Sequence, residues 1–457
     1  DGTTWMRVDT ADGSYHGEGD IAPETRLRFV KATTDMLGRQ IKEERPAFRN
    51  KSTLETTYRY NDRGLLARQT ETGMASTLFE YDAMGSIIRS GLDVNDNGQL
   101  DLISGDRITD NDRVYRLEDG AWQIVSTTKV YPVKGDSTAT TVSTLKRQLS
   151  GFTESQVSKE ITIDVHGNRT IRSAAINRAD KTVTERTDTP FSSIDAQRVI
   201  VNGLLVSQNT DTVAAATTYT YDALGRLIAV KEPRHTASSR TEYYAGKNQI
   251  ITRTDADGNT TTYKYYKNGK ISAGKIRWIK DPLGQKTYFR YNKLGLQRLS
   301  WGDAVYPQKY TYNKYGELTS LTTWRDTADN YDFSTLPWSQ PEDGDRTSWN
   351  YDIPTGLLKH KQYADGARTN YRYNTANRLT RRIWAREGDG LHTIYRYNKR
   401  TGELKRVDYE DPNTADITYR YDRLGRHTEV TDATGTRTFS YDPNTLQLIA
   451  ETLDADF

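Results

Sequence analysis

The sequence contains no cysteine and no long apolar run. The first absence excludes disulfide bonds and thiol catalysis. The second predicts that no helix spans a membrane, because such a helix needs about 20 consecutive apolar residues. Hydrophobic residues make up only 35% of the 457 residues, and the mean hydropathy is −0.83, which is low for a compact globule. The chain therefore has little aliphatic material for an ordinary core.

The common signatures of catalysis and of nucleic-acid binding are missing as well. The 64 basic residues are balanced by 61 acidic ones, and a net charge of +3 gives no basic surface for nucleic acid. The six histidines are scattered without zinc-binding spacing, and no nucleophile elbow, P-loop or dinucleotide fingerprint occurs. The sequence alone does not exclude a pair of carboxylates at the spacing that glycosidases use, although most acidic residues occupy positions where we expect turns. We predict that the chain is not an enzyme and binds no nucleic acid.

Tyrosine, in contrast, is abundant, with 30 copies. Eleven times an aromatic residue, a polar spacer and a tyrosine follow one another; the eleven tyrosines are Tyr60, Tyr81, Tyr221, Tyr265, Tyr291, Tyr312, Tyr351, Tyr373, Tyr397, Tyr421 and Tyr441. From Tyr291 onward they recur at steps of 21, 39, 22, 24, 24 and 20 residues, and the step of 39 indicates one hidden repeat. A regular period of this size predicts a repeat architecture, in which each unit buries its apolar face against its neighbours.

One repeat reads as strand, tight turn, strand. Side chains alternate along a strand, so both aromatic rings lie on one face and the polar spacer lies on the other. After the tyrosine come Asp or Asn, two variable residues and glycine, as in Asp222 to Gly225. The Asx side chain can bond the backbone of the turn, and glycine accepts the positive φ that closes it. Asn377 replaces glycine in one copy, and asparagine is the next best residue there.

These repeats predict an all-β fold, a strip of stacked hairpins that curls as it grows. No capped segment with helical periodicity is long enough to predict a helix. We divide the chain into a lead-in or cap at 1–50, repeats at 51–91, a divergent region at 92–216 and a regular array at 217–457. In the divergent region, Asp164 to Asn168 is the one hint of a degenerate turn.

The motifs Tyr219-Thr-Tyr-Asp-Ala-Leu-Gly-Arg-Leu227 and Tyr419-Arg-Tyr-Asp-Arg-Leu-Gly-Arg426 resemble the YD-repeat, or Rhs-repeat, family. The family includes bacterial polymorphic toxins, the shell-forming parts of insecticidal toxin complexes, and teneurins. The resemblance implies a β-strip that spirals into a hollow shell; in the toxins the shell encloses a C-terminal toxic domain released by self-cleavage. The family's shell-closing region, with its autoproteolytic aspartates, is not visible before Phe457. We therefore expect a partial or complete wall.

The resemblance implies a structural function: the wall of a secreted bacterial Rhs-type protein that encapsulates or presents a C-terminal polypeptide cargo. The alternative is an extracellular, adhesin-like module that binds carbohydrate or protein at a cell surface. Exposed aromatic platforms would favour the alternative, and an enclosed volume would favour the wall.

One loop has the spacing of a calcium site. Asp93, Asn95, Asn97, Gln99 and Asp101 place oxygen-bearing side chains at positions 1, 3, 5, 7 and 9 of a loop with glycine at position 6. Hard cations need several oxygens that converge from a tightly turned backbone. Position 12 is serine, so the expected bidentate acid is missing. The loop is a candidate site for Ca²⁺, and the alternative is a polar connection without metal.

Tryptophan gathers in the second half of the chain. Trp278, Trp301 and Trp324 are spaced by 23 residues, which predicts a stacked aromatic row. The alternative is an exposed platform for sugar rings, since flat aromatic side chains beside polar groups suit carbohydrate faces. For that alternative we name Trp338, Trp324 and Trp384 as candidate carbohydrate-binding residues, with Trp338 in the longest expected insertion.

Overall fold

The computed structural model describes residues 2–7, 28–50, 52–153, 155–210, 212–267, 272–303, 305–324, 344–385 and 391–454. Apart from one short 3₁₀ turn, η2 (Phe48–Asn50), the regular structure in these ranges is entirely β-strand. The all-β prediction is therefore confirmed. Among the described residues, no helix is long and apolar enough to cross a membrane. Neighbouring strands in the sequence are antiparallel neighbours in one sheet, as β4–β5 and β28–β29 show.

The chain divides into two compact units. Unit 1 comprises residues 1–113, 126–143 and 347–457, and unit 2 comprises 114–125 and 144–346. The first strands are β1 (Gly2–Arg7), β2 (Phe29–Thr34), β3 (Gln40–Pro46), β4 (Thr53–Tyr60), β5 (Leu66–Glu71), β6 (Ser76–Tyr81), β7 (Ile87–Asp93), β8 (Arg107–Glu118), β9 (Ala121–Val130), β10 (Thr140–Gln148), β11 (Gln156–Asp164) and β12 (Arg169–Asn177).

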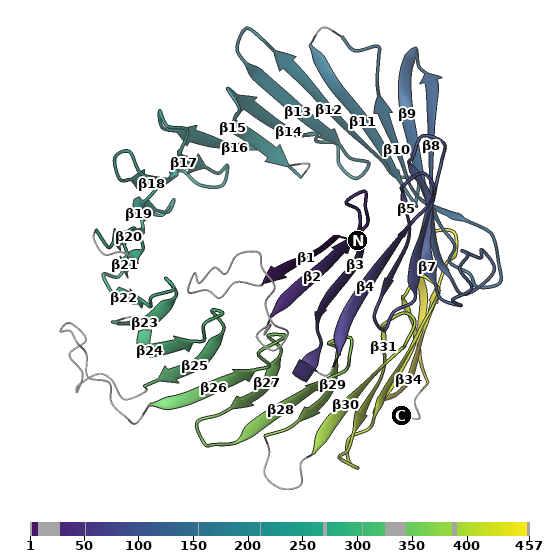
Figure 1. Ribbon diagram of the computed structural model, residues 1–457. Helices are drawn as coiled ribbons and strands as arrows, with labels where there is room; N and C mark the ends of the chain where they lie inside the picture. The colour runs from purple at the N-terminus through teal and green to yellow at the C-terminus, as the bar shows by residue number, and fades with distance from the viewer. Residues whose placement is uncertain are drawn as a thin grey trace. The chain divides into compact units, whose positions relative to one another are not determined.

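The later strands complete the two units (Figure 1). They are β13 (Thr182–Asp188), β14 (Ala196–Val201), β15 (Leu204–Thr210), β16 (Val213–Tyr221), β17 (Leu227–Lys231), β18 (Ser239–Tyr243), β19 (Ile250–Thr254), β20 (Thr260–Tyr265), β21 (Ile276–Lys280), β22 (Lys286–Tyr291), β23 (Gln297–Gly302), β24 (Val305–Tyr312), β25 (Leu318–Thr323), β26 (Asp345–Tyr351), β27 (Leu358–Gln362), β28 (Arg368–Tyr373), β29 (Leu379–Ile383), β30 (His392–Tyr397), β31 (Leu404–Tyr409), β32 (Ile417–Tyr421), β33 (His427–Asp432), β34 (Gly435–Tyr441) and β35 (Leu448–Asp454).

The turn of each repeat is closed by its Asx residue. Asp222 Oδ1 accepts the backbone N–H groups of Leu224 and Arg226 at 2.9 and 3.0 Å, and Arg226 Nε donates to Asp222 Oδ2 at 2.7 Å. Gly225 has φ +73°, and Asn377, which takes the place of glycine, has φ +57°. The turn chemistry expected from the sequence is confirmed at both positions.

In ten repeats a tyrosine hydroxyl ties its hairpin to the preceding one. Tyr291 Oη donates to the backbone carbonyl of Ile276 at 2.9 Å, across 15 residues of sequence. Its ring lies beneath Lys275 Nζ at 5.2 Å. The same hydroxyl bond, 2.7–3.1 Å long, joins Tyr60 to Gln40, Tyr81 to Leu66, Tyr221 to Leu205, Tyr243 to Leu227, Tyr312 to Gln297, Tyr373 to Leu358, Tyr397 to Leu379, Tyr421 to Leu404 and Tyr441 to His427. We call this contact the tyrosine clasp.

The residue after the turn glycine completes the clasp from the other side. Arg226 binds the aspartate of its own turn, and its guanidinium lies 4.6 Å from the ring centre of Tyr243 in the following hairpin. The same stacking joins Arg39 to Tyr60, Arg378 to Tyr397 and Arg426 to Tyr441. In these four repeats the turn therefore holds the next tyrosine both by its ring and by its hydroxyl group. Tyr243 belongs to a repeat that the sequence pattern misses, because Thr241 replaces the first aromatic residue.

Fully buried apolar side chains are few, as expected for a single layer of hairpins. In unit 1 they gather around Leu78, Leu100, Ile108 and Tyr131. The divergent region forms strands too, and Asp164 closes the β11–β12 turn by accepting the N–H groups of His166 and Asn168 at 2.9 Å. The hint of a degenerate turn there is confirmed. The hidden repeat between Tyr312 and Tyr351 falls largely on 325–343, outside the described residues.

Replacement of a clasp tyrosine measures this contact. We expect Tyr291→Phe to cost about 1–3 kcal/mol, since it orphans the Ile276 carbonyl, and Tyr291→Ala to cost about 3–5 kcal/mol, since it also removes the ring. Urea unfolding monitored by circular dichroism gives both values. Tyr306→Ala is the control, because Tyr306 is 63% exposed, and it should cost less than about 0.5 kcal/mol. Equal losses at Tyr291 and Tyr306 would contradict the clasp.

The turn aspartates predict an acid limit to stability. Hydrogen bonds, first from the Arg226 side chain and then from backbone N–H groups, hold the pKa of Asp222 below its ordinary value of 3.8. The unfolded chain therefore binds this proton more readily, so the contribution is complete above about pH 3.8 and is lost as the pH falls through the folded pKa. The difference in urea midpoint between the wild type and Asp222→Asn should shrink between pH 7 and pH 2.5. Leu224→Ala, at an exposed position of the same turn that carries no titrating group, should show no such trend.

Candidate functional site

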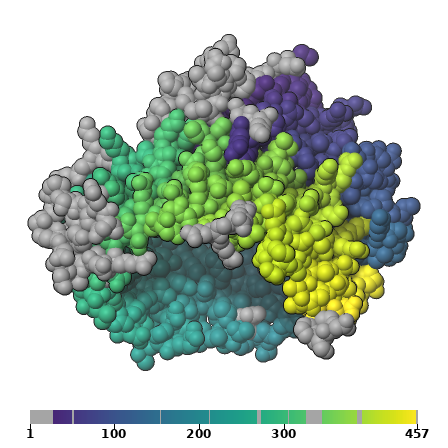
Figure 2. Space-filling view, turned by 90° about the horizontal axis from the view of Figure 1, so that it is seen from below, coloured from purple at the N-terminus to yellow at the C-terminus, as the bar shows by residue number. Residues whose placement is uncertain are grey.

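Unit 1 contains a seam, by which we mean the contacts between its residues 28–143 and its residues 352–443. The partners are 290 to 331 residues apart in sequence. In Figure 1, β3 and β4 lie beside β28–β30, and in Figure 2 the purple N-terminal strands adjoin the light green hairpins. The seam contacts come mainly from turns and strand ends, because the edges of the hairpins meet there.

Backbone and side-chain groups both take part in the seam. Ala75 N donates to the Arg400 carbonyl at 2.7 Å, which extends the backbone bonding of the sheet across the seam. The other polar contacts are Arg28 Nε to Ile353 O (2.7 Å), Phe48 N to Asn377 Oδ1 (3.0 Å), Asn377 Nδ2 to Pro46 O (3.3 Å), Arg49 N to Asp352 Oδ1 (3.2 Å), Arg378 Nη2 to Gly73 O (2.9 Å), Arg400 Nη1 to Asp96 Oδ2 (2.6 Å) and Thr140 Oγ1 to Pro443 O (2.5 Å).

Arg423 is a buried basic residue of the seam. It follows the aspartate of the β32–β33 turn, and only 6% of it is exposed. Its guanidinium donates to four backbone carbonyls: Asp106 (2.5 Å), Leu102 (2.5 Å), Asp101 (3.1 Å) and Val133 (3.3 Å). Burial lowers the pKa of Arg423 from its usual range. A buried cation whose protons are satisfied by backbone carbonyls fixes the 101–106 and 133 segments against the turn.

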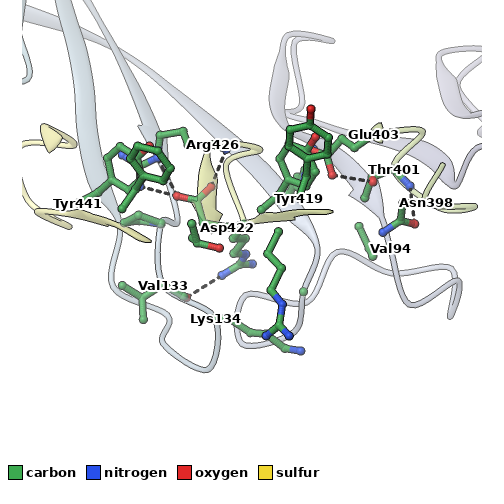
Figure 3. A pocket seen from close by; sticks show the side chains of 18 of the residues that line it. Val94, Val133, Lys134, Asn398, Thr401, Glu403, Tyr419, Asp422, Arg426 and Tyr441 are labelled. Atoms are coloured by element: carbon green, nitrogen blue, oxygen red, sulfur yellow. Dashed lines mark hydrogen bonds and ion pairs between the residues drawn. The ribbon is translucent and has the colours of Figure 1, made fainter. Parts of the chain in front are cut away.

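A pocket of about 710 Å³ opens beside Arg423. Figure 3 shows Asp422 and Arg426 pointing toward each other beside the Tyr441 ring, with Lys134 and Val94 on the opposite wall. The Arg426 guanidinium lies 3.9 Å from the Tyr441 ring centre, and its Nη2 lies 2.6 Å from Asp422 Oδ2.

The acidic groups of this pocket are already engaged. Arg107 Nη2 donates to Glu403 Oε1 at 2.6 Å, and Thr401 Oγ1 donates to Glu403 Oε2 at 2.7 Å. Burial raises the pKa of the Tyr421 phenol, which stays neutral and donates to the Leu404 carbonyl at 2.7 Å. The chemistry available here is that of structural ion pairs and hydrogen bonds, which join two distant parts of unit 1.

The predicted calcium loop lies against Arg423. The Asp93 carboxylate is fully buried and accepts the backbone N–H groups of Asn97 (3.1 Å) and Gly98 (2.9 Å). The amides of Asn95 and Asn97 both donate to Asp101 Oδ2, at 3.1 and 2.6 Å. Among the described residues, no group of three or more His, Asp or Glu is placed to hold a metal ion.

The five loop residues thus share one tight turn. The remaining one, Gln99, donates its backbone N–H to Asn97 Oδ1 at 2.9 Å. Whether Asp93, Asn95, Asn97, Gln99 and Asp101 bind Ca²⁺ stays a prediction.

The tryptophans occupy different environments. Trp278, Tyr288 and Trp301 are cross-strand partners, and the Tyr288 and Trp301 rings stack with 5.5 Å between centres, which forms part of the expected aromatic row. Trp324 is 5% exposed. Trp384 Nε1 donates to Thr393 Oγ1 at 2.9 Å, and Arg382 covers its ring at 3.9 Å. Trp338 lies outside the described residues, and carbohydrate binding stays a prediction.

Sequence reasoning misses Arg423 and the rest of the seam. The equivalent turn position carries Asp62, Ala223, Lys293 or Lys399 in other repeats, so a basic residue there is not distinctive. The partners of Arg423 are backbone carbonyls at least 290 residues away, which leave no trace in local pattern. Only a residue-by-residue comparison of turns across many related chains could have marked this position.

Comparison with known proteins agrees with this architecture. Residues 24–457 match the model of the Teneurin YD-shell family. A crystal structure of TcdB2-TccC3 without its hypervariable C-terminal region is similar, with a TM-score of 0.50 and 12% identity over 93% of this chain and 23% of that one. A crystal structure of TcdB2-TccC3-Cdc42 gives a TM-score of 0.48 and 13% identity, over 91% of this chain and 25% of that one.

The chain thus spans about a quarter of the length of these solved chains. The first likeness shows the fold, since its identity is too low to carry function. No curated protein matches the sequence.

The contribution of Arg423 to the stability of the seam can be measured. Arg423→Met keeps the length of the side chain but orphans four carbonyls, and we expect a loss of about 3 kcal/mol in the free energy of unfolding. Arg420→Met is the matched control, because the Arg420 side chain is 75% exposed, and it should cost less than about 1 kcal/mol. Hydrogen exchange should accelerate at residues 101–106 in the first variant alone. Similar losses in both variants would show that the seam does not depend on Arg423.

Proposed function

The chain belongs to the Teneurin YD-shell family, and from this premise we propose that it is part of a shell wall that encloses a polypeptide. Its shell-forming role follows from the family, and the enclosed polypeptide is the proposal. The observation that supports it is the seam, in which the N-terminal repeats of unit 1 bond to the C-terminal ones. A strip that only displayed its faces would not need contacts between repeats 290 or more residues apart.

The composition of the wall suits this role. The clasp uses tyrosine, arginine and backbone carbonyls in place of a thick hydrophobic core, so the sheet can be a single layer and still be rigid. Such a layer separates an inner from an outer face with few residues per unit of area. We propose that the natural protein is a secreted bacterial Rhs-type protein and that its cargo is a polypeptide segment of the same gene product.

The test uses the full-length product of the gene that encodes this chain. We expect limited proteolysis with intact-mass analysis to find a segment that is cleaved from the repeats, copurifies with them and resists protease. Arg423→Met should open the seam and make that segment sensitive to protease, because the four hydrogen bonds of the buried Arg423 guanidinium are lost. Arg420→Met should leave the segment protected.

Two outcomes would overturn the proposal. In the first, no segment of the gene product is protected by the repeats. In the second, the repeats bind glycans or a surface protein on an array while nothing is enclosed, which would make the chain an adhesin-like module.

A further inference from the structure

Two arginines face each other across neighbouring strands of unit 1. Arg372 on β28 and Arg381 on β29 are direct partners in the register, on the face opposite the tyrosine rings. Arg368 lies four residues before Arg372 and therefore on the same face. Arg49 from η2 lines the same cavity of about 120 Å³ as Arg372. We call Arg49, Arg368, Arg372 and Arg381 the arginine patch.

The charge of the patch is not neutralised by an ion pair among the residues that the structure describes. None of its four guanidinium groups has a carboxylate within ion-pair distance there. Arg368 Nη2 contacts His360 Nδ1 at 3.0 Å, and the buried Asp352 carboxylate accepts the backbone N–H of Arg49 at 3.2 Å.

The charges of the patch act against one another. Burial lowers the pKa of Arg372, and repulsion by Arg49, Arg381 and Arg368 lowers it further. Like charges directly opposite each other destabilise a pair of strands. The wall alone gains nothing from this arrangement.

The next arginine pair along the sheet shows what is missing. Arg396 and Arg406 are partners in the register of β30 and β31, as Arg372 and Arg381 are in β28 and β29. Both bind the Asp408 carboxylate, and Arg406 Nη2 also lies 2.6 Å from Asp416 Oδ2. Two carboxylates therefore neutralise this second pair.

The register identifies the residues that replace those carboxylates at the patch. Asp408 lies two residues after Arg406, and the residue two after Arg381 is Ile383. Asp416 lies two residues before Thr418, the partner of Arg406. The residue two before Ile394, the partner of Arg381, is His392. Isoleucine and histidine thus stand where the compensated pair has aspartates, and the carboxylate beside this position, Glu410, is bound to the histidine instead of to an arginine of the patch.

Because the described residues place no carboxylate in an ion pair with these arginines, we propose that the arginine patch binds an acidic polypeptide segment, whose carboxylates take the places that Asp408 and Asp416 fill at the neighbouring pair. The occupant is a peptide because two carboxylates already satisfy the same guanidinium geometry in this sheet. An extended peptide places alternate side chains about 7 Å apart, so two of its acids can reach the Arg372–Arg381 pair and Arg368 together. This inference goes beyond the wall role, because a wall forms without a ligand.

The experiment measures binding of a fluorescein-labelled octaglutamate peptide to the full chain by fluorescence anisotropy at low salt. Arg372→Gln with Arg381→Gln should weaken binding at least tenfold, which equals about 1.4 kcal/mol. Arg372→Lys with Arg381→Lys should retain part of the affinity, since lysine keeps the charge but loses the planar fork. Binding should fall as salt is added.

Two further variants separate recognition from general charge. Ile383→Asp restores a carboxylate at the position of Asp408 and should weaken peptide binding while all four arginines remain. Arg240→Gln with Arg253→Gln removes the same charge from two exposed positions of unit 2 and should leave the affinity within about twofold. Arg381→Gln alone should raise the melting temperature, because it relieves the repulsion of Arg372.

Several results would overturn the proposal. The first is that the wild type does not bind the peptide. The second is that the Arg372/Arg381 and Arg240/Arg253 double variants weaken binding equally. The third is that inorganic phosphate or single-stranded DNA binds more tightly than octaglutamate. None of these results touches protease protection of an enclosed segment, so failure here and failure of the wall proposal are distinguishable.

Discussion

The bond from a tyrosine hydroxyl to a carbonyl of the preceding hairpin holds the regular repeats together. It joins neighbouring repeats, and in four of them an arginine also lies over the same ring, as Arg226 does over Tyr243. Because the hydroxyl donor and the ring come from the short motif, a repeat that has the motif carries the means of attaching to its neighbour. A strip built in this way can lengthen without a growing core, which explains why so few apolar side chains are fully buried in the part of the chain that the structure describes.

The seam joins parts of unit 1 that the clasps do not reach. Clasps act between neighbours in sequence, so they cannot hold together parts of a strip that meet only after folding. At the seam, unit 1 uses charged side chains and backbone groups. The Arg423 hydrogen bonds and the Arg107–Glu403 ion pair join segments that are about 300 residues apart. Polar contacts suit hairpin edges, because turns and strand ends expose unpaired carbonyl and N–H groups that must find partners. A seam of this kind is directional, so it fixes the register of the two edges more firmly than apolar packing would.

The sequence predicted the repeated part of this architecture well because its causes are local. The ring face, the Asx turn and the positive φ at Asn377 each follow from a few consecutive residues. The repeat at Tyr243 escaped because threonine replaced its first aromatic residue, although its clasp is intact. Seam residues such as Arg423 could not be predicted, since their partners are remote backbone groups. For the loop at Asp93 to Asp101, the sequence indicated a tight polar turn, and the structure adds that Asp93 is buried beneath it.

Function in a repeat protein of this kind resides in the departures from the motif. The residues that build the clasp recur in ten repeats, whereas the charges of the spacer face differ from one pair of strands to the next. At Arg396 and Arg406 the sheet supplies its own carboxylates, while at Arg372 and Arg381 it supplies Ile383 instead. An arginine pair that has no ion-pair partner among the described residues destabilises its two strands, and an acidic segment bound there would relieve this repulsion. The repeats thus provide one scaffold, and the unpaired positive charge on the spacer face of β28 and β29 distinguishes these two strands from β30 and β31.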